Sequence, residues 1–326
     1  NASIPMNRLI FFSSRSYFTF EPVKNLDYEH LTKSNTTNES DTSLVILHGL
    51  FGSAQNWRSP STKLLNHSKH LKDIFLVNLR NHGTSPHHDD MDYPHLASDV
   101  AHFIDEHLPK TKIALLGHSL GGKTAMHLAL NSQWLLSSER KPKLDQLIVV
   151  DIAPIDYSSL MSGDDEDDHT QFAKLLASIP LEKLKNRREA DQYLKEHLDS
   201  EMVRQFLLTN LKQDKQTKQF YWQPNLSSID NYYPALKQFP DSHWPTDRYN
   251  DMSEVNPNPL PTTMFIAGGL SNYIHGKHHD KSKAAINKYF PKASIRTIEK
   301  AKHWPHFGPT ANTFIEIVSQ FIDERK

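Results

Sequence analysis

The stretch GHSLGGKTAM, residues 117–126, decides how the rest of the chain is interpreted. It places Ser119 between Gly117 and Gly121, after an apolar run and before a run of helix-forming residues. A residue on so tight a strand-to-helix turn has strained backbone angles, and its neighbours fit only if they carry almost no side chain. The pattern G-x-S-x-G also arises by chance about 0.1 times per 300 residues of average composition. Ser119 is therefore a candidate nucleophile only if the rest of the chain supplies the partners that such a serine needs.

Apolar segments and helical patterns alternate on both sides of this turn. Short apolar runs predict buried strands, and apolar residues spaced three and four apart predict amphipathic helices. The predicted strands are residues 44–47, 73–79, 112–116, 146–151, 262–267 and 294–298, and the predicted helices are residues 93–108, 120–130 and 311–324. Buried strands that alternate with helices indicate the α/β class, with a mostly parallel, doubly wound sheet that carries helices on both faces.

A different pattern separates the fourth and fifth predicted strands. Helical segments are predicted at residues 170–179, 187–198 and 201–211, and they are followed by the proline-rich run 255–261. We predict a core formed by residues 21–153 and 255–326, with residues 154–254 as a helical lid over the carboxyl ends of the strands. The acidic run at 163–168 is interpreted as a solvated approach to a helix rather than as a metal or peptide site.

Composition excludes several classes of function. The chain has 326 residues with 37 basic and 38 acidic side chains, which suits one large α/β domain and gives no sign of a nucleic-acid partner. The absence of cysteine excludes a disulfide scaffold, a thiolate nucleophile and cysteine-ligated metal. The 20 histidines are interpreted mostly as solvated loop residues rather than metal ligands. No apolar run approaches the roughly 18 residues of a membrane span, and no G-x-G-x-x-G follows a strand, so neither stable membrane insertion nor a cofactor is expected.

The first twenty residues differ from the rest of the chain. They contain Arg8, Arg15 and several serines, and no acidic residue precedes Glu21. This composition is typical of a mitochondrial presequence or its remnant, and it predicts a mitochondrial protein. The alternative is an N-terminal extension that leads into a strand near residues 17–20.

A nucleophilic serine needs a base that takes its proton, an acid that orients the base, and N–H groups that hold the developing oxyanion. His303 is the candidate base, because it lies between the last predicted strand and the final helix. His306 is the local alternative. His303 is favoured because it lies nearer the end of the strand.

The candidate acid is Asp151, a single carboxylate at the end of the apolar strand 146–151. In a doubly wound sheet this strand lies beside the strand that leads to Ser119. The place after strand 262–267, where many such enzymes carry the acid, reads Gly-Gly-Leu-Ser, and the next acid is Asp280. The alternative role for Asp151 is to cap the following turn.

Two backbone segments are candidates for the oxyanion site. One is the N–H of Leu120, which directly follows the serine at the N-terminus of a helix. The other is the loop HGLFG at residues 48–52, whose two glycines let the backbone curl around an oxygen. The N–H of Leu50 is the first choice there, and that of Phe51 is the second.

Taken together, the motifs resemble one α/β-hydrolase family. It includes mitochondrial α/β-hydrolase-domain esterases, YbfF-type bacterial esterases and yeast ethanol acetyltransferases. The motifs are HGLFGS at 48–53, RNHG at 80–83 with SPH at 85–87, GHSLGGKTAM at 117–126, VDIAP at 150–154, FYW at 220–222 with NL at 225–226, and GGLS at 268–271. The resemblance runs from about residue 44 to the C-terminus, and it implies that Ser119, Asp151 and His303 form a catalytic triad. Asn78 stands where the family usually has Asp, and a stretch around 134–144 looks inserted; both departures weaken the transfer of substrate preference.

This resemblance implies acyl transfer through an acyl-enzyme. The first expectation is an alcohol acetyltransferase that makes ethyl acetate from ethanol and acetyl-CoA, which would be a substrate rather than a cofactor, with esterase and thioesterase side activity. The alternative is a plain carboxylester hydrolase or thioesterase. The expected partners are thus a small-molecule acyl donor and either an alcohol or water. An alternative outside enzymes is a non-catalytic small-molecule receptor on the same scaffold. It is disfavoured because all three triad residues are present in order.

Overall fold

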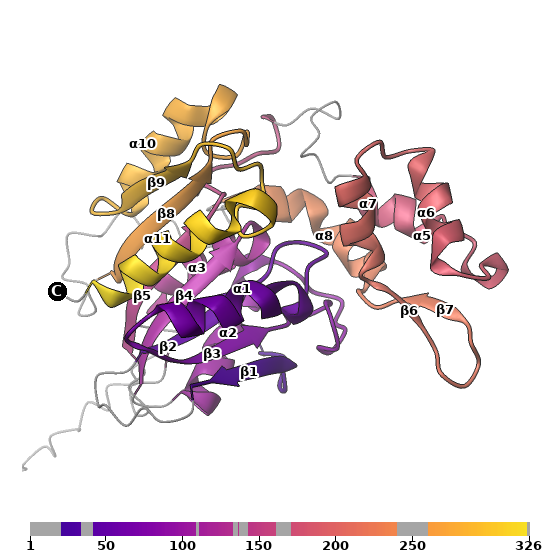
Figure 1. Ribbon diagram of the computed structural model, residues 1–326, viewed down its shortest axis with the longest axis horizontal. Coiled ribbons are helices and arrows are strands. Elements are labelled where there is room, and N and C mark those ends of the chain that lie inside the picture. Colours follow the sequence, from indigo (N-terminus) through magenta and orange to yellow (C-terminus); the bar gives the residue numbers. More distant parts are fainter. Residues whose placement is uncertain are drawn as a thin grey trace, which may run out of the picture.

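The computed structural model describes residues 21–33, 42–108, 111–132, 136, 143–160, 171–239 and 260–324. Its centre is a seven-stranded sheet in the order β1-β3-β2-β4-β5-β8-β9 (Figure 1). The strands are β1 (Tyr28–Thr32), β2 (Thr42–Leu47), β3 (Leu71–Val77), β4 (Lys112–His118), β5 (Lys143–Val150), β8 (Thr262–Gly268) and β9 (Ser294–Ile298). All neighbouring pairs are parallel except β1 and β3, which are antiparallel at one edge. The predicted parallel α/β sheet is confirmed.

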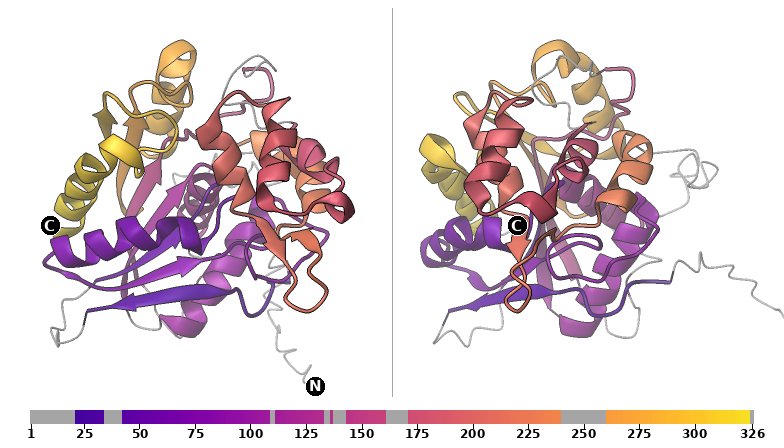
Figure 2. Two further views of the ribbon diagram at one scale, coloured as in Figure 1. Left: turned by 45° about the vertical axis from the view of Figure 1, so that its right-hand side comes forward. Right: turned by 90° about the vertical axis from the view of Figure 1, so that its right-hand side faces the viewer.

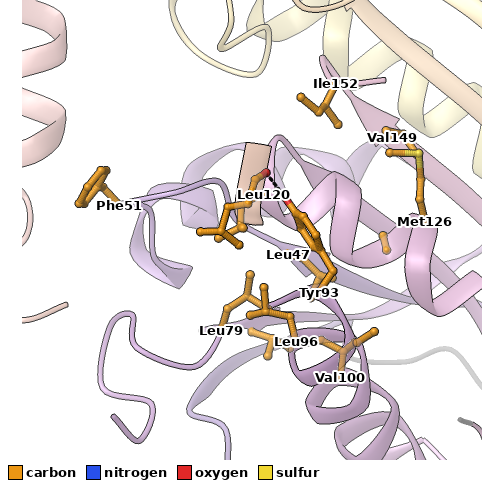
Figure 3. Packing of buried hydrophobic residues seen from close by; sticks show 14 of the residues in the cluster. Leu47, Phe51, Leu79, Tyr93, Leu96, Val100, Leu120, Met126, Val149 and Ile152 are labelled. Carbon is orange, nitrogen blue, oxygen red and sulfur yellow. Dashed lines mark hydrogen bonds between the residues drawn. The ribbon is translucent and has the colours of Figure 1, made fainter. Parts of the chain in front are cut away.

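Helices cover both faces of this sheet because the side chains of the central strands alternate between two apolar clusters. In β2, Leu44 and Ile46 belong to one cluster, while Val45 and Leu47 belong to the other. The first cluster is completed by α1 (Ala54–His67) and α11 (Ala311–Asp323), which lie side by side (Figure 1). The second is completed by α2 (Tyr93–His107), α3 (Leu120–Leu130) and α10 (His279–Tyr289), and part of it is drawn in Figure 3.

The chain between β5 and β8 forms a separate group of elements, which we call the helical insert (residues 171–239). It contains α5 (Phe172–Ala177), α6 (Arg187–Lys195), α7 (Glu201–Leu208), the hairpin β6 (Leu211–Gln213) and β7 (Phe220–Trp222), and α8 (Leu226–Lys237). Figure 2 shows these elements gathered at one end of the sheet. The backbone N–H of Asn225 donates to Asn81 O after β3, and that of Tyr157 after β5 donates to Lys237 O. The insert therefore covers the carboxyl ends of the parallel strands, where ligands bind in open α/β sheets.

Several sequence-based expectations fall outside the described residues. These are the N-terminal segment 1–20, the acidic run 163–168, most of the stretch around 134–144 and most of the proline-rich run 255–261. The predicted boundaries of the lid at 154 and 254 also remain predictions. Within the described helices, none is long and apolar enough to cross a membrane.

Candidate active site

Ser119 occupies the turn between β4 and α3 with backbone angles φ 51° and ψ −112°. The flanking glycines make this conformation possible. A Cβ on Gly117 would lie 2.1 Å from the Gly121 carbonyl oxygen, and a Cβ on Gly121 would lie 2.4 Å from the Leu47 carbonyl oxygen. Both distances are far shorter than a van der Waals contact, so neither position accepts another residue without movement of the backbone. The strained turn predicted from the sequence is present.

Asp151 follows β5, the neighbour of the serine's strand. In the β4–β5 register, His118 pairs with Val150, so Ser119 and Asp151 leave the sheet at the same level. The Asp151 side chain is fully buried, and its Oδ2 lies 2.8 Å from Nδ1 of His303. Because a carboxylate oxygen only accepts, the imidazole Nδ1 carries the hydrogen, which leaves Nε2 as the basic nitrogen of the ring.

The turn at 268–271, where the sequence lacks an acid, instead supplies donors to Asp151. The backbone N–H of Gly268 donates to Oδ1 over 2.8 Å, and the hydroxyl of Ser271 donates to Oδ2 over 2.5 Å. Each oxygen of the buried carboxylate is therefore hydrogen-bonded, as a buried charge requires. The resemblance pointed to this turn without indicating what it does.

His303 contacts its neighbours through both its ring and its backbone. It stacks on Tyr273 with a centroid distance of 4.2 Å, and its backbone carbonyl accepts from Nε2 of His118 over 2.8 Å. His306 lies elsewhere: its ring stacks on Trp57 at 4.0 Å, and burial lowers its pKa well below the ordinary value. The structure thus brings His303, and not the alternative His306, to Asp151.

The two first-choice oxyanion donors face no internal acceptor. Within the described part of the chain, the N–H groups of Leu50 and Leu120 make no hydrogen bond to protein. The N–H of Phe51 is different, because it donates to Nε2 of His82 over 3.1 Å. The second choice, Phe51, is therefore corrected: its N–H is already used to hold the loop. The loop itself lies against the serine, since a Cβ on Gly49 would be 3.4 Å from the Ser119 Cβ.

Two buried imidazoles fix this loop, and sequence reasoning gave neither a role. His48 Nδ1 donates to Gly49 O over 2.8 Å, and His48 Nε2 accepts from the N–H of Leu79 over 3.1 Å. His82 Nδ1 donates to Arg80 O, and its Nε2 accepts from Phe51. A ring that both donates and accepts must be neutral. Burial, the largest cause in each case, lowers the pKa of His48 to about 3 and that of His82 to about 4.

A pocket with an empty volume of about 460 Å³, part of it open to solvent, lies over Ser119. Its wall is mostly apolar and aromatic, with contributions from the core and from α8. The lining residues are Leu50, Tyr93, Ser119, Leu120, Lys123, Ile152, Tyr157, Tyr233, Leu236, Lys237 and Tyr273. Figure 3 shows Tyr93 of α2, Leu120 of α3 and Ile152 of the segment after β5. No group of three or more acidic or histidine side chains that could hold a metal ion occurs within the described ranges.

Comparisons with known proteins identify relatives that match most of the chain. A family model described as "alpha/beta hydrolase fold" matches residues 42–309. The chain is 33% identical to the "sn-1-specific diacylglycerol lipase ABHD11" of Xenopus laevis, over 86% of this chain and 79% of the relative. It is 30% identical to the Escherichia coli "Esterase YbfF", over 84% of this chain and 90% of the relative. It is also 30% identical to a "Probable alcohol acetyltransferase" of Saccharomyces cerevisiae, over 86% and 78% of the two chains.

Solved structures agree with these sequence relationships. A structure titled "Marine microorganism esterase" superimposes with a TM-score of 0.73 and 30% sequence identity, covering 91% of this chain and all of that one. A structure titled "Crystal Structure of E-2-(Acetamidomethylene)succinate Hydrolase" superimposes with a TM-score of 0.65 at 13% identity, over 92% of this chain and 95% of that one, and this likeness concerns the fold alone.

Proposed function

The chain belongs to the alpha/beta hydrolase fold family, and from that premise we propose that it is a serine carboxylester hydrolase that works through an acyl-enzyme on Ser119. The observation that carries the proposal is the buried pair of Asp151 and His303, whose Oδ2 and Nδ1 are 2.8 Å apart beside the strained serine turn. The family resemblance inferred from the motifs is confirmed by the comparisons.

The proposed reaction uses each group in turn. The Ser119 hydroxyl oxygen attacks the ester carbonyl while its proton passes to Nε2 of His303, and the N–H groups of Leu50 and Leu120 stabilise the oxyanion. His303 then returns the proton to the leaving alcohol, and the acyl group stays on Ser119. Water, deprotonated by His303, releases the acid and restores the serine. Asp151 keeps the imidazole in the tautomer that both steps need.

Hydrolysis is proposed ahead of ethanol acetylation, which reverses the order expected from the sequence. The esterase and lipase names carried by the relatives and by the similar structure support this order. The aromatic pocket also suits the acyl part of a carboxylic ester, and its described lining includes no arginine that could bind the phosphates of a coenzyme A donor.

The proposal is tested with purified protein and p-nitrophenyl esters of graded acyl length, together with an sn-1,2-diacylglycerol. We expect the wild-type protein to release p-nitrophenol. The Ser119→Ala variant should do so at least three orders of magnitude more slowly, although its unfolding temperature should be unchanged. Hydrolysis by Ser119→Ala at the wild-type rate would remove the proposed nucleophile. The most rapidly cleaved chain length would define the substrate class.

Alcohol acetyl transfer remains the second candidate because of the Saccharomyces cerevisiae relative. An acyl-enzyme that water can attack can also be attacked by an alcohol, and the outcome depends on how the pocket positions the acceptor and excludes water. The test supplies acetyl-CoA with increasing ethanol and quantifies ethyl acetate and free acetate together. Ester that rises at the expense of acetate would support the transferase, whereas acetate alone would assign a thioesterase.

A mitochondrial localisation is also proposed, on the basis of the arginine- and serine-rich residues 1–20. The test compares the location in cells of the chain with and without these residues, each fused to a fluorescent protein at the C-terminus. Identical distributions would reject a targeting role for this segment.

A further inference from the structure

A buried asparagine joins the helical insert to the loop that carries the proposed oxyanion donor. Asn210 lies between α7 and β6 and is 2% exposed. Its side-chain Nδ2 donates to the backbone carbonyl oxygen of Phe51 over 2.7 Å, a contact between residues 159 positions apart in the sequence. The carbonyl of Asn210 accepts from the N–H of Gln223 over 3.0 Å, so the hairpin β6–β7 holds the asparagine in place.

Phe51 is in a conformation that needs such support. Its φ of 58° lies in the left-handed region, which is unfavourable for a residue with a large side chain. His82 holds the N–H of Phe51 from the core, and Asn210 holds its carbonyl from the insert. The Phe51 ring also packs against Phe172 of α5, with centroids 6.2 Å apart. Two contacts from the insert therefore stabilise this residue.

The contact of Asn210 is transmitted to Leu50 through two peptide groups. The peptide that carries the Phe51 carbonyl also carries the N–H of Gly52, and this N–H donates to Gly49 O over 2.9 Å. The peptide that carries the Gly49 carbonyl also carries the N–H of Leu50. Because a peptide group is planar, the direction of one end determines that of the other. Hydrogen bonds in such a chain also polarise one another.

We propose that Asn210 is a positioning residue through which the helical insert sets the direction of the Leu50 N–H at the oxyanion site. The inference rests on the proposed acyl-transfer function. Catalysis then depends on contact between the insert and the loop that follows β2 (residues 48–53, here called the β2 loop), in addition to any role of the insert in enclosing substrate. Removal of the Nδ2 donor lets the Phe51–Gly52 peptide reorient. Stabilisation of the oxyanion is then weakened, whereas binding of the ester substrate is not.

The test replaces Asn210 with Leu, which has a similar size and no donor, and with Ala as a second variant. We expect kcat/KM for a p-nitrophenyl ester to fall about 10- to 100-fold, less than the loss of a complete donor, while KM changes less than about threefold. The inhibition constant of an alkyl trifluoromethyl ketone, which forms a tetrahedral adduct with the serine, is expected to rise by a similar factor. The inhibition constant of the carboxylic acid product should stay within about threefold.

Asn225→Ala is the matched control. Asn225 is also an asparagine of the insert. Its Nδ2 lies 3.3 Å from Oδ1 of Asn81 and 3.5 Å from His88 O, and its Oδ1 accepts from the N–H of Ser228, so its side chain makes no hydrogen bond to residues 48–53. This variant reports what loosening the insert does in general, and its kcat/KM is expected to stay within about threefold of wild type. The two Asn210 variants and the control are compared at temperatures well below their unfolding midpoints.

Three outcomes would overturn the inference. Full activity of Asn210→Leu would show that the contact has no effect on the site. Equal losses in Asn210→Leu and Asn225→Ala would assign the effect to general loosening of the insert. A loss of activity without weaker binding of the trifluoromethyl ketone would place the defect outside the oxyanion site. A wild-type protein that cleaved no ester and bound no trifluoromethyl ketone would contradict the proposed function itself. When the wild type is active, the variants test the role of Asn210 alone.

Discussion

The carboxylate of Asp151 has donors at both oxygens, and this arrangement determines what an amide would do in its place. The N–H of Gly268 faces Oδ1, while His303 Nδ1 and the Ser271 hydroxyl face Oδ2. An amide NH₂ cannot point at the Gly268 N–H, because two donors repel. The amide of an asparagine would therefore place its NH₂ toward His303, where only an unprotonated Nδ1 can accept it.

We therefore expect Asp151→Asn to trap the imidazole in the wrong tautomer, with its hydrogen on Nε2. That nitrogen could then no longer take the proton of Ser119, and kcat should fall by about 10⁴-fold, the loss typical of this substitution in a serine triad. The measurement is steady-state ester hydrolysis, with unfolding followed by circular dichroism. Asp145→Asn, on the same strand and paired with Lys143 at the surface, is the control and should retain wild-type activity. A kcat within tenfold of wild type would mean that another acid orients the base.

At the level of single residues, chain order and strand ends carried most of the information. Asp151 and His303 could be predicted to approach each other because each follows a strand of one parallel sheet, and the structure brings them together. The contributions of Gly268 and His82 could not be predicted. Both act through hydrogen bonds that exist only when distant segments meet, and a backbone N–H has no signature in the sequence.

Helix α8 is anchored to the core by a lysine buried in α3. Nζ of Lys123 donates to the carbonyl oxygens of Lys237 and Gln238 over 2.7 and 3.0 Å, and Leu236 O lies at 3.5 Å. The side chain is 2% exposed, and burial lowers its pKa to about 7. These carbonyls end the helix, where its dipole favours a cation. The lysine of the serine motif therefore holds the insert rather than the serine.

We expect Lys123→Met to loosen α8 without unfolding the sheet. The variant keeps the length of the side chain and removes its hydrogen bonds to buried carbonyls, which should lower the free energy of unfolding by about 1–3 kcal/mol. Urea denaturation measures this loss, and limited proteolysis should cut the insert faster than in the wild type. Lys174→Met provides the control, because Lys174 also belongs to the insert and its side chain is 72% exposed. Equal protease resistance of Lys123→Met and wild type would contradict the anchoring role.

Among the elements, the buried strands and most of the amphipathic helices could be predicted, whereas helix α1 and the edge strand β1 were missed. Residues 44–47 and 264–267 are all apolar, because both faces of these strands are covered. Helix α1 was not predicted, since Pro60 lies inside it and its buried face includes Ser61. Strand β1 was also missed because this edge strand is only partly buried and its sequence, YEHLT, has little apolar character.

For the molecule as a whole, some of the described histidines are exposed and others are buried. They were interpreted mostly as solvated loop residues, and His87 and His88 are indeed exposed. Seven others are buried in the described part of the chain: His48, His82, His118, His127, His278, His303 and His306. The burial of these histidines could not be predicted from their neighbours in the sequence, because it depends on partners from distant segments. One example is Trp57, which stacks on His306.

Four of these buried imidazoles make the stability of the protein depend on pH. Burial lowers the pKa of His48 and His127 to about 3, that of His82 to about 4, and that of His306 well below the ordinary value. In the unfolded chain each has the ordinary pKa of about 6.5. Between pH 6.5 and about 4 the unfolded state therefore binds protons that the folded state does not bind, and stability falls as the pH falls.

We expect the free energy of unfolding to drop steeply between pH 7 and pH 5. Each histidine contributes a loss of about 2 kcal/mol at pH 5, and four together approach the whole stability of a typical domain, about 5–15 kcal/mol. Urea denaturation at several pH values measures how the free energy of unfolding changes per pH unit, and this slope is proportional to the number of protons taken up on unfolding. His306→Phe preserves an aromatic ring against Trp57 and should reduce that number by about one, whereas His88→Phe at the surface should leave it unchanged. A free energy of unfolding that stayed constant from pH 7 to pH 5 would contradict the assignment of neutral, buried imidazoles, and with it the account of how His48 and His82 hold the loop beside Ser119.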